Sequence, residues 1–156
     1  MLVIVIGGTA SQKRRVTSMV EFCAQQLVPR LKSLEVIVKL TAIPTVAHGY
    51  CMAYADGPNL DRPRDFIIEV ERTNNLRLVL ETVAHEMIHV KQYARGELYY
   101  SPIKRKYRWC GRWINYRISY WQQPWEKEAF RKEKVLLDSW LEKEGLQNRK
   151  WAKEEE

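Results

Sequence analysis

The residues His85-Glu86-Met87-Ile88-His89 form the pattern with the clearest chemical potential, and they use two of the three histidines in the chain. Side chains four residues apart share one face of a helix, with Cβ atoms about 6 Å apart. Two imidazole nitrogens at that spacing can bind one zinc ion at about 2.0–2.1 Å. Glu86, roughly 100° further round the helix, can reach a water molecule on the metal. The pattern predicts His85 and His89 as zinc ligands and Glu86 as the general base.

A catalytic zinc ion takes three protein ligands and leaves one position for water. One candidate for the third ligand is His48, which lies upstream in a turn-rich stretch. The other candidates are Glu126 and Glu128, on a helix predicted to begin at Pro124. Apolar residues follow Glu126 at the third and fourth positions, so Glu126 is expected to face the core. Basic residues follow Glu128 at the same spacing, so Glu128 is expected to face solvent, and Glu126 is the preferred ligand.

Two segments, His85–His89 and Glu126–Ala129, resemble the two halves of the gluzincin metallopeptidase signature, HExxH on one helix and an ExxA-type stretch on a later helix. The small size and the gap between the segments are similar to those of minigluzincins and of other short, SprT-like metallopeptidases. The resemblance implies a zinc-dependent peptidase that acts on peptides or proteins. In the related ExxAD pattern an aspartate follows the alanine, whereas Phe130 stands there in this chain, so the motif does not identify the partner of a zinc-binding histidine.

This resemblance also implies roles in hydrolysis. Glu86 would take a proton from the zinc-bound water and deliver it to the leaving amine. A tyrosine or histidine would stabilise the oxyanion. Tyr120, shortly before the glutamate helix, is the candidate, with Tyr116 and His48 as alternatives. Residues 65–71 are predicted to form an exposed edge strand to which an extended peptide substrate could add.

The net charge of +7 is concentrated in one window, Lys91 to Arg117, which holds eight bases and one acid, Glu97. The same window is rich in aromatic residues: Tyr99, Tyr100, Tyr107, Trp109, Trp113 and Tyr116. Basic residues interleaved with aromatic ones are typical of nucleic-acid binding. A twisted hairpin with inward aromatics and solvated bases is the simpler interpretation of the window and is preferred to nucleic-acid binding. Two alternatives to the peptidase therefore remain open: a nucleic-acid-associated zinc protein, and a non-catalytic, metallopeptidase-like interaction domain.

The rest of the chain must form the elements that position these residues. Apolar runs and turn signals predict strands at 2–6 (buried), 34–40, about 50–55 and 66–70, and a hairpin at 107–116 that turns at Cys110-Gly111. Helical spacing predicts helices at 11–31 (capped by Ser11), 76–95 (capped by Asn74 or Asn75 and closed by Gly96) and 124–143 (ended by Gly145). The expected fold class is α+β: one metallopeptidase domain over 1–150, with helices on both faces of a mixed β-sheet, an active-site helix and a C-terminal glutamate helix. Residues 151–156 are expected to be a frayed tail.

Composition excludes several classes of protein. The 156 residues are 46% hydrophobic and 29% charged, as in a single globular domain. No stretch approaches the roughly 18 apolar residues of a membrane helix. The apolar run Met1–Ile6 is too short for a signal peptide. Three scattered cysteines favour neither a disulfide framework nor a zinc ribbon, so a reducing, cytoplasmic location is expected.

Overall fold

The computed structural model describes residues 1–54, 61–115 and 117–153, and these residues form one α+β domain. Its strands are β1 (Leu2–Ile6), β2 (Glu35–Thr41), β3 (Gly49–Tyr54), β4 (Asp65–Glu71), β5 (Leu98–Ser101), β6 (Lys106–Trp109) and β7 (Arg112–Asn115). Its helices are α1 (Ala10–Leu27), α2 (Leu76–Ala94) and α3 (Pro124–Lys143), with short 3-10 helices η1 (Tyr120–Gln122) and η2 (Lys150–Ala152). No helix among the described residues has the length and apolar character needed to cross a membrane.

The main sheet has the strand order β1-β2-β4-β3. β1, β2 and β4 are parallel, and β3 pairs with β4 in the antiparallel direction. The prediction that residues 65–71 form an exposed edge is wrong, because β4 is paired on both sides. The open edge beside β4 is β3, with Gly49 opposite Val70. Asp65 and Glu69 of β4 lie on the face of the sheet opposite the three long helices.

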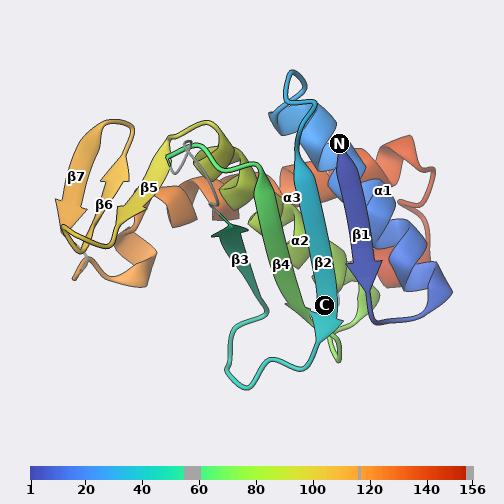
Figure 1. The fold of residues 1–156 in the computed structure, drawn as a ribbon. Helices are drawn as coiled ribbons and strands as arrows, with labels where there is room; N and C mark the ends of the chain where they lie inside the picture. The colour runs from blue at the N-terminus through green and yellow to red at the C-terminus, as the bar shows by residue number, and fades with distance from the viewer. Residues whose placement is uncertain (55–60, 116, 154–156) are drawn as a thin grey trace.

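All three long helices lie on one face of the main sheet (Figure 1). The covered face holds fully buried residues of the two central strands, such as Val38 and Ile68. On the opposite face Ile4 is 40% exposed and Tyr54 49% exposed. The expected α/β/α layering is therefore wrong, and so is the expectation that residues 2–6 form a buried strand. β1 is an edge strand with one open face, so its apolar run reflects strand propensity rather than burial on both sides.

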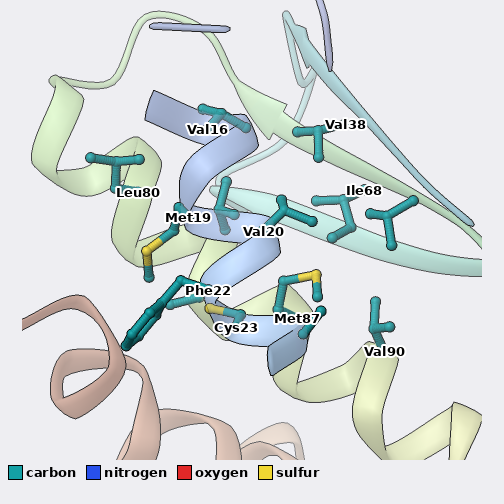
Figure 2. Close-up of a cluster of buried hydrophobic side chains, with 14 of the residues drawn as sticks. Val16, Met19, Val20, Phe22, Cys23, Val38, Ile68, Leu80, Met87 and Val90 are labelled. Carbon is teal, nitrogen blue, oxygen red and sulfur yellow. The ribbon is translucent and has the colours of Figure 1, made fainter. Parts of the chain in front are cut away.

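The core lies between the covered face of the sheet and the helices (Figure 2). Met19 and Cys23 of α1 and Met87 of α2 are buried there, at most 1% exposed. Trp140 of α3 is also buried, and its indole nitrogen donates a hydrogen bond to the Ser18 hydroxyl at 3.0 Å. α2 packs against both other long helices, so it is the central helix of this layer.

Capping residues explain where the helices begin. The N-cap of α1 is Thr9, which forms a reciprocal capping box with Gln12, so the predicted cap, Ser11, is wrong by two residues. Asn75 caps α2, as predicted, by accepting a hydrogen bond from the Leu78 amide at 2.9 Å. α3 begins at Pro124 and ends at Lys143, as predicted.

A second sheet, of order β5-β6-β7, stands beside the main one (Figure 1). The predicted hairpin is confirmed, because β6 and β7 are antiparallel and turn at Cys110 and Gly111, both with positive φ. The third strand, β5, was not predicted. At the C-terminus, Ala152 is only 3% exposed, and its carbonyl accepts a hydrogen bond from Arg77. The expectation of a frayed tail is therefore wrong for Trp151 and Ala152, which pack on the domain. Residues 154–156 lie outside the described residues.

Candidate metal centre

α2 brings both histidines of the HExxH pattern to one buried position. His85 and His89 are one turn apart, and their Nε2 atoms lie 3.2 Å from each other. Both side chains are buried, although one rim of the site faces a cavity. The rigid i, i+4 spacing of the helix fixes this convergence.

Glu126 reaches the same point from the first turn of α3. One of its carboxylate oxygens lies 3.2 Å from Nε2 of His85, and the other lies 3.3 Å from Nε2 of His89. The candidate ligand atoms of His85, His89 and Glu126 all lie within 4.8 Å of one another, so this buried group could hold a metal ion. The inward orientation predicted for Glu126 is confirmed, since its side chain is buried.

Glu128 does not join this group, but the prediction that it faces solvent is wrong. Its carboxylate lies 2.9 Å from the Lys91 ammonium and also accepts hydrogen bonds from Gln92 and Lys132. These donors lower the pKa of Glu128 to about 2, although partial burial opposes the shift. Lys132, one of the two bases that suggested an exposed face, instead pairs with this half-buried carboxylate, together with Lys91 of α2.

Two further residues orient the imidazole rings, and both were missed by sequence reasoning. His85 Nδ1 lies 2.6 Å from Glu133 Oε2, and His89 Nδ1 lies 2.8 Å from Gln92 Oε1. The Gln92 amide nitrogen donates to the Trp125 carbonyl at 3.0 Å and to Glu128, so its oxygen is left to face His89. A carboxylate and an amide oxygen can only accept, and therefore each Nδ1 atom is the donor.

This hydrogen bonding fixes the tautomers and makes both Nε2 atoms acceptors. When both rings are neutral, two imidazole nitrogens and one carboxylate oxygen therefore face a common point as acceptors. Such a group is repulsive unless a cation occupies the point. Burial lowers the pKa of His85, but hydrogen bonds with Glu126 and Glu133 outweigh burial and raise it to about 10. The carboxylates that favour a proton on His85 favour a metal cation for the same electrostatic reason, so the residues fit a metal ion.

Glu86 lies beside the ligand group and is buried. Burial raises the pKa of its carboxyl group, and the two imidazoles oppose that rise. Strand β3 passes close to it at Gly49, where a Cβ atom would lie 3.2 Å from Glu86 Oε1 and 2.5 Å from Thr82 Cγ2. The absence of a side chain at Gly49 therefore lets the edge strand approach the general base predicted from the sequence.

The site opens into a cavity of about 830 Å³, large enough for several residues of a peptide. From α2 the cavity is lined by Leu78, Glu81, Thr82, His85, Glu86, His89 and Tyr93, a stripe at helical spacing. The opposite wall comes from β3, from the second sheet, and from η1 with the start of α3. The cavity therefore runs along α2, with the candidate metal centre midway.

The three candidates for oxyanion stabilisation differ in their placement. Tyr120 lines the cavity, and its hydroxyl donates a hydrogen bond to Glu126. Burial, followed by that hydrogen bond, raises the pKa of the Tyr120 phenol. His48 also lines the cavity, but its Nδ1 faces Asn74 Nδ2 at 3.3 Å and it does not join the ligand group. Tyr116 lies outside the described residues.

A sequence signal for Glu133 and Gln92 does exist. Gln92 follows His89 by three residues and Glu133 follows Glu126 by seven, so each shares a helix face with a ligand. Phe130, in the position of the aspartate of the ExxAD pattern, packs edge-on against His85 with ring centroids 4.8 Å apart. The carboxylate that contacts His85 is that of Glu133, three residues after Phe130.

Comparison of the chain with protein-family models, with curated proteins and with solved structures gives no match. The assignment of the candidate metal centre consequently rests on the geometry and donor chemistry of His85, His89 and Glu126.

Proposed function

We propose that the chain is a zinc-dependent peptidase of the gluzincin type. The observation that carries this proposal is the convergence of His85, His89 and Glu126 beside the buried Glu86, in a cavity that can admit a peptide. A purely structural metal site would have four protein ligands and no open side. Here three ligands and an adjacent carboxylate border the cavity, as a hydrolytic site requires.

The donor set favours zinc over harder cations. Two imidazole nitrogens and one carboxylate suit zinc, whereas magnesium and calcium prefer oxygen ligands. When bound, zinc would lower the pKa of a water ligand toward about 7 and polarise the scissile carbonyl. Glu133 and Gln92 would keep the two imidazoles in the tautomers that this binding requires.

Glu86 is proposed as the general base. Its carboxylate would accept a proton from the attacking water and pass it to the leaving amine nitrogen. Burial raises its pKa above that of an exposed glutamate, which strengthens it as a base. Tyr120, at the rim of the same cavity, is proposed to donate a hydrogen bond to the developing oxyanion.

The substrate is proposed to bind as an extended peptide along β3. This strand, and not residues 65–71, is the open edge beside the site. Gly49, Tyr50 and Cys51 of β3 line the cavity, so backbone groups of this edge can pair with a peptide next to Glu86. The three free cysteines are consistent with a reducing compartment, and a cytoplasmic location is part of the proposal.

The decisive experiment measures metal content by elemental mass spectrometry in the parent protein, in Glu126→Ala and in the matched control Glu128→Ala. The parent is expected to hold about one zinc ion per chain, Glu126→Ala to lose it, and Glu128→Ala to retain most of it. A folded parent that holds no zinc, even after zinc is supplied, would contradict the proposal.

Hydrolysis is then tested with a peptide library and the Glu86→Gln variant. The parent should cleave peptides, whereas Glu86→Gln should keep its zinc and lose cleavage, because an amide cannot accept the proton. Zinc binding without cleavage of any peptide would favour the non-catalytic interaction domain. Equal cleavage by both proteins would exclude Glu86 as the base.

A further inference from the structure

The excess of positive charge in the sequence falls on and around the second sheet. Residues 98–117 contain six bases and no acid. Two other bases of the predicted basic window are already paired: the Lys91 ammonium lies 2.6 Å from Glu97 and 2.9 Å from Glu128, and Arg95 lies 3.1 Å from Glu97. Lys91 is also buried. The basic surface is therefore smaller than the window suggested and belongs to β5, β6, β7 and their turns.

The two faces of this sheet differ. On the inner face Tyr107 and Trp109 pack against Trp125 of α3, with ring centroids 4.8 Å and 6.2 Å apart. On the outer face Tyr99, Arg108 and Trp113 lie in register across the three strands. Tyr107 and Trp109 thus pack inward, as the simpler interpretation of the window expected, whereas Tyr99 and Trp113 contact each other on the outer face.

The outer row alternates rings and cations. The Arg108 guanidinium lies 5.0 Å from the Tyr99 ring centroid and 5.9 Å from that of Trp113, and the Lys104 ammonium lies 4.3 Å from the Trp113 centroid. These contacts hold the cations against the rings, and Lys104 is exposed while Arg108 is partly exposed. Trp113 is 41% exposed, and Lys106 is exposed one pair further along the same face. Asp61 approaches Arg108 only at 3.9 Å, the limit of an ion pair.

We propose that this outer face, made of Tyr99, Lys104, Lys106, Arg108 and Trp113, binds single-stranded nucleic acid. The three cations would contact successive phosphates, and the exposed surface of Trp113 would stack on an unpaired base. An acidic peptide would satisfy the cations but would gain nothing from the exposed indole. A duplex would offer the phosphates but keeps its bases stacked on one another. The proposal does not depend on the metal centre or on peptidase activity.

The test is fluorescence anisotropy with a labelled 20-nucleotide oligothymidylate at several salt concentrations. Four proteins are compared: the parent; a triple variant Lys104→Ala, Lys106→Ala, Arg108→Ala; Trp113→Ala; and a charge-matched control Lys13→Ala, Arg14→Ala, Arg30→Ala, altered at exposed residues of α1 and of the loop after it. The triple variant should bind at least 10-fold more weakly than the parent. Its slope of log K against log salt should be shallower by about 2, because each lost phosphate contact removes about 0.7 from the slope. Trp113→Ala should bind roughly 5- to 100-fold more weakly with an unchanged slope, because it loses stacking and not charge.

Several outcomes would overturn the proposal. An equal loss of affinity for the oligonucleotide in the charge-matched control would show that only the net charge of the protein matters. An unchanged affinity in Trp113→Ala, together with equal competition by polyglutamate, would assign the face to an acidic protein partner. Tighter binding of a duplex than of the single strand would exclude the stacking role. Lys104→Glu, in an exposed turn where misfolding is not expected, should weaken binding by itself; an unchanged affinity there would also contradict the proposal.

Discussion

Nδ1 of His85 lies 2.6 Å from Oε2 of Glu133, a residue of a different helix. Glu133 lies two turns after Glu126 on α3, so one face of this helix supplies both a candidate ligand and the carboxylate that orients another ligand. The two contacts join α2 and α3 at both sides of the His85 ring. The docking of these helices therefore determines the geometry of the candidate metal centre.

Replacing Glu133 with alanine should weaken zinc binding without removing a ligand. Loss of the acceptor frees the His85 ring to rotate and lowers its basicity, and such losses typically cost 10- to 100-fold in metal affinity. Competition with a chelator measures the affinity. Glu133→Gln keeps an acceptor and should lose less zinc affinity than Glu133→Ala. Glu142 is an exposed glutamate on the same helix, so Glu142→Ala should keep the zinc affinity of the parent. Equal affinities for the parent and Glu133→Ala would show that the contact has no role in metal binding.

Much of the candidate site was predictable, because the spacing of residues within a helix is fixed by the helix itself. The pair His85 and His89 follows from this spacing alone, and the amphipathic pattern of α3 was enough to prefer Glu126 over Glu128. The same reasoning failed for the environment of Glu128. Whether a side chain at the border of the apolar stripe meets solvent or Lys91 depends on the helix opposite, which a local pattern does not reveal.

The errors in the fold have a similar origin. The alternation of apolar and polar residues in β4 indicates that one face of the strand is covered and the other is open. It does not indicate which strands pair with β4 on either side. The antiparallel pairing of β3 with β4 depends on tertiary contacts, so the sequence pattern assigned the open edge to the wrong strand. Likewise, Gln92 and Glu133 lie at helix positions where many polar residues occur, and only the meeting of α2 and α3 gives them a common function.

Gly49→Ala should disturb Glu86 from the neighbouring strand. The new Cβ would lie 2.5 Å from Thr82 Cγ2 and 2.9 Å from the Glu69 carbonyl, so β3 must move away from α2. We expect a loss of about 1–3 kcal/mol in the free energy of unfolding, typical of overpacking. Urea denaturation measures this loss.

A double variant tests the cause of that loss. Thr82→Ser removes the methyl group that the new Cβ would meet and keeps a hydroxyl for the bond to the Leu78 carbonyl. Thr82→Ser combined with Gly49→Ala should therefore recover part of the stability. If the free energy of unfolding lost in the double variant equals or exceeds the sum of the losses in the two single variants, the clash with Thr82 is not the cause.

Acid should destabilise the protein partly through Glu128. Its pKa in the folded chain is about 2, below its ordinary value of 4.5, so its contribution to stability is present above about pH 4.5 and is lost as the pH falls towards 2. Glu128→Gln should be less stable at pH 7 by about 1–2 kcal/mol, because solvent screens part of the attraction around this half-buried carboxylate. Urea denaturation at pH 7, 4 and 2.5 should show the difference between parent and variant shrinking as the pH falls. A constant difference across this range would exclude the ion pairs of Glu128 as the source.

Tyr120→Phe tests the proposed role of the hydroxyl at the rim of the cavity. The variant keeps the ring, which packs at right angles to Phe130 with centroids 6.1 Å apart, and removes only the hydrogen-bond donor. If Tyr120 stabilises the oxyanion, kcat should fall by about 100-fold while KM changes little, because the interaction forms only in the transition state. Zinc content should stay near that of the parent, since Tyr120 is not one of the ligands. A loss of zinc with a proportional loss of activity would instead assign the hydroxyl to holding Glu126, with which it is hydrogen-bonded in the structure.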